Sequence, residues 1–512
     1  MGALGSGSVK VMLGRAAAMG IGFACAPIFG RMFNPAECGV ATLVESMVVW
    51  IAGFASLGYA QAIPLAADKG EVRGLTRLSF LLNCGLLALL CLLALLFLLV
   101  PICGTSVGRW FGKPELARFI WFVPVLFLLS TLSDTSHYVY SQQGRFGGLS
   151  VLVLAGTGLA KPLQIALGWF FGGTSLMLLM GASLSGVLAV ALAGIVIVPL
   201  LFGASKGGMS MGAVARRHQQ FPRVQLWNTV LQSTSSSVPM LLIGVLFDST
   251  VVGLFGMARK LVMLPVSLLA MSLGAVFYPE AAAEWRRDGS ARDSIMGTFR
   301  ILSMLSVFPT VCLCLLGPLL FSVFLGEKWF EAGVYAQLLA PYVMVLVFTG
   351  PMKWLFLIGN RAGRYFAYNV AAVVGKPLAV LGGAWYASGA PALWHALGAA
   401  GPVWLDGPRV AVFLYALAGS LVEGGLLLDA VRLGGVRPAE VAGVVMREVA
   451  VSAALLLPAA IVFWAGGPPV PALALASLGA VAQFVVLYRR EEAVRRWTWR
   501  AVSLVRRGSV TG

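Results

Sequence analysis

Long runs of apolar residues dominate the chain and recur along almost its whole length; one of them extends from Leu78 to Val100. Runs of about 20 residues match the hydrocarbon thickness of a bilayer. They are apolar on all sides instead of alternating, which favours helices over barrel strands. The pattern predicts an all-α polytopic membrane protein with about fourteen transmembrane helices. We expect these near 9–30, 38–64, 78–102, 117–140, 148–171, 176–203, 222–246, 250–278, 298–325, 332–358, 365–387, 408–430, 447–465 and 470–488.

Lysine and arginine are distributed unequally between the two sides of these spans. The side with both termini and the even-numbered connections carries 26 of them, and the other side carries 6. Positive residues accumulate on the cytoplasmic side of membrane proteins. The count therefore predicts cytoplasmic N- and C-termini in a cytoplasmic (inner) membrane.

An internal repeat is visible at an offset of 214 to 215 residues. Phe33-x5-Gly39 recurs as Phe247-x5-Gly253, and Lys161-Pro162-Leu163 recurs as Lys376-Pro377-Leu378. Pro64 and Gly112 have counterparts in Pro279 and Gly326. This offset covers six spans, an even number, so we expect two parallel six-helix lobes related by an axis along the membrane normal. The predicted parts are an N-terminal lobe (1–212), a C-terminal lobe (213–435), two further helices (436–488) and a basic cytoplasmic tail (489–512).

Composition excludes several functional classes. Of the 512 residues 59% are hydrophobic and only 11% are charged, too few charges for a soluble domain. The net charge of +17 lies mostly in short connections, so it indicates topology and membrane lipids as partners, and we expect no nucleic acid. The sequence contains no P-loop, HExxH or G-x-S-x-G motif and no histidine cluster that would complete a metal site. We therefore expect no enzyme, no cofactor and no metal.

Charged residues inside the spans are the candidates for function, because each costs about 2.5–3.5 kcal/mol at a helix centre. Arg259 is the strongest of them, since its planar fork matches phosphate oxygens. The alternative is a structural ion pair with Glu45, which the repeat offset relates to Arg259. Lys260 is adjacent. These cations predict a substrate-binding cavity for an anion.

Lys161 and Lys376 occupy equivalent places in the two lobes. They could form a symmetric cationic lining for phosphate, or each ammonium could bond a carbonyl that the following proline frees. Asp134 and His137 share a helical face and could couple transport to ions, or they could form a buried hydrogen-bonded pair. For Glu423 both ion coupling and structural pairing are open.

Several motifs resemble one transporter family. They are Phe33-Asn34-Pro35-Ala36-Glu37-Cys38-Gly39, Val252 to Lys260, Phe324-Leu325-Gly326-Glu327-Lys328-Trp329-Phe330-Glu331-Ala332-Gly333, and Gly359-Asn360-Arg361. In this order they are similar to oligosaccharide flippases of the Wzx type, within the multidrug/oligosaccharidyl-lipid/polysaccharide exporter superfamily.

The resemblance implies two lobes around a cationic cavity and a cavity role for Arg259. It also implies a polyprenyl-pyrophosphate-linked oligosaccharide as substrate, flipped from the inner to the outer leaflet, with polysaccharide polymerase and glycosyltransferases as partners. The alternatives are a lipid II flippase, a drug/cation antiporter of the same superfamily, and a membrane-embedded glycosyltransferase or polymerase.

Overall fold

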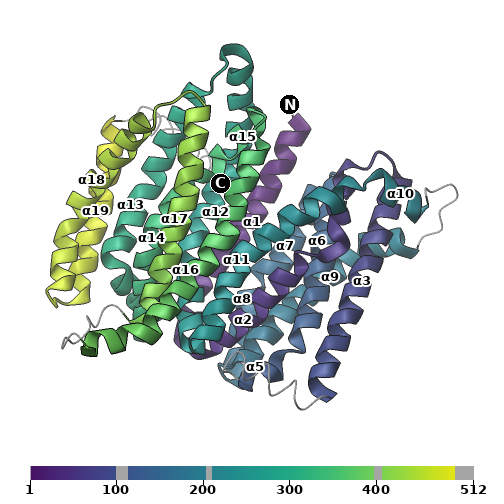
Figure 1. Cartoon of the computed structure of the whole chain (residues 1–512), viewed down its shortest axis with the longest axis horizontal. Coiled ribbons are helices and arrows are strands. Elements are labelled where there is room, and N and C mark those ends of the chain that lie inside the picture. The colour runs from purple at the N-terminus through teal and green to yellow at the C-terminus, as the bar shows by residue number, and fades with distance from the viewer. Residues whose placement is uncertain (1, 100–113, 203–209, 397–405, 491–512) are drawn as a thin grey trace, which may run out of the picture. The chain divides into compact units, whose positions relative to one another are not determined.

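Helices make up nearly all of the structure. The computed structural model describes residues 2–99, 114–202, 210–396 and 406–490, and no strand occurs within these ranges (Figure 1). The predicted all-α class is confirmed. Gly112 of the repeat and the predicted basic tail beyond residue 490 lie outside the described residues.

The helices follow one another with short connections. The first part of the chain forms α1 (Gly2–Met32), α2 (Pro35–Ala52), η1 (Ala55–Leu65), α3 (Lys69–Leu99), α5 (Pro114–Phe119), α6 (Phe122–Gln142), α7 (Phe146–Val153), η2 (Leu154–Gly158), α8 (Ala160–Phe171) and α9 (Ser175–Phe202). The middle part forms α10 (Met211–Arg217), η3 (Phe221–Gln225), α11 (Leu226–Leu246), α12 (Ser249–Asp288), α13 (Arg292–Leu325) and η4 (Glu327–Trp329). The last part forms α14 (Phe330–Met352), α15 (Trp354–Ile358), α16 (Ala362–Ala396), α17 (Gly407–Leu433), α18 (Pro438–Trp464) and α19 (Pro469–Arg490).

Among the described residues, twelve helical segments are long and apolar enough to cross a membrane. They coincide with twelve of the fourteen predicted spans. The other two predicted spans fall on α6 and α12, which do not meet the same criterion over the described residues. The chain is a multi-pass membrane protein, and the total of fourteen spans stays a prediction.

The structure divides into two units. Unit 1 contains residues 1–264, 321–335 and 362–422, and unit 2 contains residues 265–320, 336–361 and 423–512. Four of the boundaries fall inside α12, α13, α14 and α17, and the fifth falls between α15 and α16. The two six-helix lobes and the other parts expected from the repeat stay a prediction.

The second predicted span is not one continuous helix. α2 ends at Ala52, and Ser56, Leu57 and Gly58 adopt left-handed φ angles of 49°, 48° and 80°. The break is stabilised from α3, because the side-chain oxygen of buried Asn83 accepts a hydrogen bond from the Ser56 amide at 2.6 Å. Hydropathy does not predict this break, because the residues on both sides of it are apolar.

The fifth predicted span is also interrupted. α7 and α8 are separated by a π-helical turn at 154–158, which ends three residues before Lys161. Single π-helical turns frequently occur at functional sites, because they rotate the residues that follow around the helix axis. Lys161 therefore projects in a different direction from the one that an unbroken helix would give it.

α2 and α12 cross at two glycines of unit 1. A Cβ atom on Gly39 would lie 1.8 Å from the Ser249 carbonyl oxygen, and one on Gly253 would lie 1.8 Å from the Pro35 carbonyl oxygen. Only glycine permits this backbone approach. Gly39 and Gly253 are equivalent positions of the sequence repeat, so this pair of repeat positions meets at one crossing.

In unit 2, α18 packs along α13, and α19 packs on α18 (Figure 1). Arg292 at the start of α13 forms an ion pair with Glu440 at 2.5 Å. At the last residue of α18, the indole nitrogen of Trp464 donates to the Leu315 carbonyl oxygen of α13 at 3.0 Å. A buried hydrogen bond from Gln483 to Glu448 joins α19 to α18. The two helices predicted outside the repeat are thus attached to α13.

Candidate functional site: a cationic cluster in unit 1

An ion pair joins α2 to α12. Lys260 Nζ donates to Glu45 Oε2 at 2.7 Å, and the two side chains are 50% and 35% exposed. Sequence analysis offered Arg259 as the ion-pair partner of Glu45. In the structure, the partner of Glu45 is Lys260, the residue that follows Arg259.

Arg259 points toward α11 instead. Its guanidinium donates to the carbonyl oxygen of Ser236 at 2.8 Å. Ser236 lies on α11, three residues before Pro239. The arginine is therefore held by a neutral acceptor, and its positive charge is not cancelled by that contact.

Lys161 also has neutral partners. Its ammonium lies 3.7 Å from the ring centroid of Phe29 on α1 and donates to Gln164 Oε1 at 2.9 Å. Gln164 is held in turn, because its Nε2 donates to the Leu178 carbonyl oxygen of α9 at 2.8 Å. These described contacts are to a ring and a side-chain amide, not to a backbone carbonyl that Pro162 would free.

Lys376 is buried on α16 and donates to the hydroxyl of Ser235 at 3.3 Å. Ser235 precedes Ser236, the acceptor for Arg259. α11 packs against both α2 and α16, so its serines contact cations from two other helices. The repeat equivalents Lys161 and Lys376 thus have different surroundings.

Three of the predicted cations and one carboxylate form a cluster. Lys161 and Lys260 interact electrostatically with each other and with Glu45, and Lys260 also interacts with Arg259. We call Lys161, Arg259, Lys260 and Glu45 the cationic cluster. Its formal charge is +2. Lys376 adjoins it through the serines of α11.

The other predicted candidates lie elsewhere. Asp134 on α6 is exposed, and the Nε2 atom of His137 is buried with no hydrogen-bond partner in the described part of the chain. Nothing in the described contacts joins these two side chains. In unit 2, Glu423 Oε2 is likewise buried without a described partner, while its main-chain oxygen lies 3.5 Å from the Thr349 hydroxyl.

Sequence reasoning missed the neutral side chains that hold the cations. Phe29 and Gln164 resemble ordinary span residues, and no local pattern relates them to Lys161. Ser235 and Ser236 could have been found, because Gln232 to Ser237 is a run of six polar residues inside an apolar span. A polar run at that depth needs partners within the protein.

The family-like motifs hold helix ends together within unit 1. Trp329 of η4 is fully buried and donates from its indole nitrogen to the Gly30 carbonyl oxygen at 2.8 Å. Lys328 donates to the Arg31 carbonyl oxygen at 3.0 Å and to Asn34 Oδ1 at 3.2 Å. The last carbonyls of a helix lack partners within it, so η4 caps the end of α1.

The same end of unit 1 contains a second clamp. Glu37 Oε2 accepts hydrogen bonds from both the main-chain amide, at 2.6 Å, and the hydroxyl of Ser175. Ser175 is the first residue of α9, where amide groups need acceptors. The clamp therefore ties the beginning of α2 to the beginning of α9.

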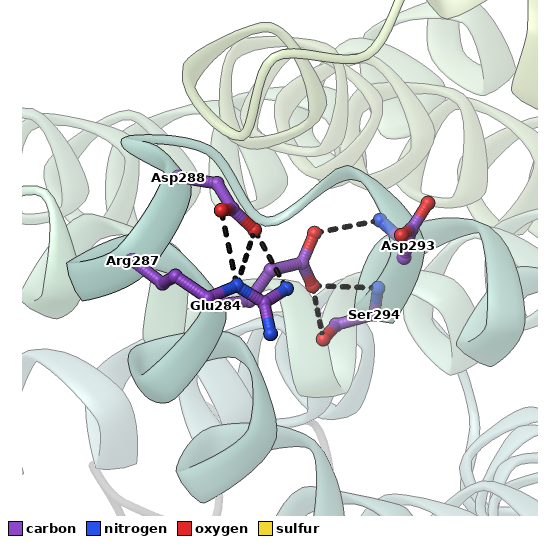
Figure 2. A network of polar contacts seen from close by, with 5 residues as sticks. All are labelled: Glu284, Arg287, Asp288, Asp293 and Ser294. Carbon is purple, nitrogen blue, oxygen red and sulfur yellow. Dashed lines mark hydrogen bonds and ion pairs between the residues drawn. The ribbon is translucent and has the colours of Figure 1, made fainter.

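Unit 2 contains a separate pocket of about 690 Å³ at the turn between α12 and α13, lined by both apolar and charged side chains. Figure 2 shows polar contacts beside this pocket, where Glu284 accepts hydrogen bonds from the Asp293 amide and from both the amide and hydroxyl of Ser294. Arg287 pairs with Asp288 beside it. Burial acts to raise the pKa of Glu284, but the hydrogen bonds from Ser294 and Asp293 outweigh it and lower that pKa. Glu284 thus caps α13 as a carboxylate.

Comparison with known proteins identifies relatives in sequence and in fold. The chain is 19% identical over 289 residues to the teichuronic acid biosynthesis protein TuaB of Bacillus subtilis, a match that covers 54% of this chain and 56% of TuaB. The match thus spans little more than half the length of that relative.

Solved structures share the fold. The lipid II flippase MurJ in an inward closed conformation superposes with a TM-score of 0.65 at 10% identity, covering 94% of this chain and 98% of that one. An inward-facing multidrug resistance MATE transporter of the MOP superfamily gives 0.58 at 14% identity, covering 83% and 95%. Identities this low establish the fold alone.

A family model extends this likeness to more than half of the sequence. The model described as polysaccharide biosynthesis protein matches residues 28–333, which include the helices that carry Glu45, Lys161, Arg259 and Lys260. The chain therefore belongs to the polysaccharide biosynthesis protein family and has the fold of MurJ and MATE transporters.

Proposed function

We propose that the protein flips a polyprenyl-pyrophosphate-linked oligosaccharide from the inner to the outer leaflet of the cytoplasmic membrane. The observation that carries this proposal is the cationic cluster, with three cations and one carboxylate on helices of a membrane protein. Each charge at such a position costs about 2.5–3.5 kcal/mol, so an excess of positive charge has a role beyond packing.

The chemistry of the cluster suits a pyrophosphate group. Arginine and lysine are the side chains that bind phosphate oxygens, and arginine can do so with two parallel hydrogen bonds. Arg259 and Lys161 are held by neutral partners, so their charges remain available to an anion. The family match to polysaccharide biosynthesis supports a sugar as the other part of the cargo.

Alternating access fits the contacts within unit 1. The Gly39–Gly253 crossing, the Trp329 contact to Gly30 and the Glu37 clamp all lie at one end of the unit. By the lysine and arginine count that end faces outward, with both termini in the cytoplasm. We infer that these contacts close the outer end while cargo enters from the cytoplasmic side.

The test is the fate of the lipid-linked sugar in cells that lack the protein. We expect the oligosaccharide lipid to accumulate in the inner leaflet. In intact cells, a membrane-impermeant periodate label should then fail to react with its sugar. Re-expression of the protein should restore labelling. An outer-leaflet pool of unchanged size would contradict the proposal, and accumulation of a peptidoglycan precursor instead would make the protein a lipid II flippase.

A further inference from the structure

Three buried side-chain oxygen atoms of unit 2, one each on α13, α18 and α19, have no hydrogen-bond partner among the described residues. They are the hydroxyl oxygens of Ser303 and Ser452 and the Oε1 atom of Gln483. The three residues are only 2%, 0% and 4% exposed. A buried polar atom in a membrane protein needs a partner inside the protein, so we asked whether these atoms converge.

The two serines differ from other serines of the same unit. Ser306 donates its hydroxyl hydrogen bond to the Leu302 carbonyl oxygen at 2.7 Å, and Ser477 donates to the Leu473 carbonyl oxygen at 2.8 Å. This bond to the carbonyl four residues earlier is a common way to satisfy a hydroxyl within its own helix. The hydroxyls that lack partners make no such bond and are available to a ligand.

The packing of α13 along α18 brings the two serines to the same level. Arg292 at the start of α13 pairs with Glu440 of α18 at 2.5 Å. Ser303 lies eleven residues beyond Arg292, and Ser452 lies twelve residues beyond Glu440. At about 1.5 Å per residue, these positions are roughly 17 and 18 Å along their helices from the ion pair.

A second contact between these helices gives the same register. The Trp464 indole donates to the Leu315 carbonyl oxygen, and each of these residues lies twelve positions beyond the serine of its helix. Eleven residues are also about three helical turns, so Ser303 lies on the face of α13 that carries Arg292 and meets α18. The two hydroxyls therefore converge between the helices.

A carboxyl group and an amide lie at this level too. Gln483 Nε2 donates to Glu448 Oε2 at 3.3 Å, and both residues are buried. Ser452 follows Glu448 by four residues, so the two share a face of α18. A Cβ atom on Gly479 would lie 3.0 Å from the Leu455 carbonyl oxygen, which shows that α19 approaches α18 closely beside Ser452.

We propose that Ser303, Glu448, Ser452 and Gln483 form a sodium site that fastens the α18–α19 hairpin to α13. These four side chains, which we call the oxygen cluster, offer a carboxylate, an amide oxygen and two hydroxyl oxygens, the kind of ligand that hard cations prefer. They carry one negative charge, so a monovalent cation makes the site neutral. A divalent cation would leave a net charge within the membrane, where charge is costly.

The site is separate from the proposed transport chemistry. The oxygen cluster belongs to unit 2, whereas the cationic cluster belongs to unit 1. The lack of a histidine cluster in the sequence does not bear on sodium, which binds oxygen ligands alone. The inference therefore stands independently of the proposed function.

The experiment measures binding of radioactive sodium to the purified full-length protein in nanodiscs. We expect saturable binding that unlabelled sodium displaces and equimolar potassium does not, because the larger ion would push closely packed helices apart. A ligand that binds only the folded protein stabilises it. Sodium chloride should therefore raise the midpoint of thermal unfolding above its value in equimolar potassium chloride.

Variants locate the binding at the oxygen cluster. Ser303→Ala and Ser452→Ala each remove one ligand with little change in volume, and each should weaken sodium binding by about fivefold or more, as loss of a hydrogen bond does. Glu448→Gln removes the charge and should abolish binding. Ser306→Ala and Ser477→Ala are the matched controls on α13 and α19, because their hydroxyls bond to carbonyls of their own helices, and both should bind sodium as the wild type does.

Several results would overturn the site. One is a wild type that shows no saturable sodium binding, and another is equal stabilisation by sodium and potassium. Sodium binding that is unchanged in both Ser303→Ala and Ser452→Ala would place the ion elsewhere. If ordered water fills the oxygen cluster instead, these two variants should lose the same stability in either salt. None of these results bears on flipping, which the fate of the lipid-linked sugar tests.

Discussion

At the residue scale, the site depends on cations that are held without being neutralised. A cation over an aromatic ring gains about 0.5–2 kcal/mol, and a hydrogen bond from a charged group gains about 1.5–3 kcal/mol. These gains offset much of the cost of placing Lys161 and Arg259 in a membrane span. Neutral partners leave the positive charge intact, which an anion-binding site requires.

Arg259 provides a direct prediction. Arg259→Ala should reduce surface polysaccharide at least tenfold with unchanged abundance in the membrane, because no side chain replaces the guanidinium. Arg259→Lys keeps the charge but loses the planar fork, so its output should be intermediate. Surface polymer is measured by immunoblot, and Arg300→Ala, an exposed arginine outside the cluster, is the control. Normal polymer output from Arg259→Ala would remove this residue from the mechanism.

A second prediction at this scale concerns pH and unit 2. The pKa of Glu284 is lowered in the folded state relative to its ordinary value of 4.5. The charged carboxylate therefore contributes its full stabilisation at pH values above 4.5. This stabilisation is lost as the pH falls through the lower pKa of the folded state. Glu284→Gln should lower the free energy of unfolding by about 1 kcal/mol at pH 7, as loss of a helix cap does. Thermal unfolding of the two proteins at pH 7 and below pH 4 should show the difference shrinking. An equal difference at both pH values would mean that the carboxylate charge is irrelevant.

At the element scale, the helices depart from regular geometry near the site. The π-helical turn at 154–158 precedes Lys161, and the left-handed residues 56–58 interrupt the span that carries Glu45. Pro239 lies in α11 just after the serines that contact Arg259 and Lys376. Such irregularities are tolerated in a membrane protein only where other protein groups satisfy the backbone.

The crossing of α2 and α12 provides a prediction at this scale. Gly39→Ala places a methyl group 1.8 Å from the Ser249 carbonyl oxygen, so the helices must separate. We expect a loss of about 1–3 kcal/mol in unfolding free energy, the usual effect of overpacking, and a weaker Glu45–Lys260 pair. Thermal unfolding measures the first effect. Gly20→Ala, a helical glycine with open space around it, is the control and should change little; equal midpoints for the two variants would contradict the close crossing.

At the scale of the whole molecule, charge and hydropathy define the topology. Twelve described helical segments qualify as spans, and α6 and α12 complete the predicted set of fourteen. Spans of this kind are recognised from composition alone, because the bilayer imposes length and apolarity on each helix separately. In unit 2, α18 packs on α13 and α19 packs on α18 through contacts that composition does not reveal.

The topology itself is testable with reporter fusions. Enzymatic reporters inserted after residues 70, 210, 290 and 440 should all report a cytoplasmic location, because lysine and arginine flank these positions. A fusion after residue 328 should report the opposite side and serves as the internal contrast. One cytoplasmic position found outside would require an odd number of spans before it.

The sequence alone determined the helical membrane class, the cations within the spans and the likeness to polysaccharide flippases. These depend on hydropathy, local composition and motifs, which are properties of short segments. Only the tertiary structure decided that Glu45 pairs with Lys260, that Phe29 and Gln164 hold Lys161, and that Gly39 meets Gly253. The glycine crossing and the ion pair join residues more than 200 positions apart, and even the shorter links depend on how whole helices pack. Hydropathy does not indicate which helices pack against each other.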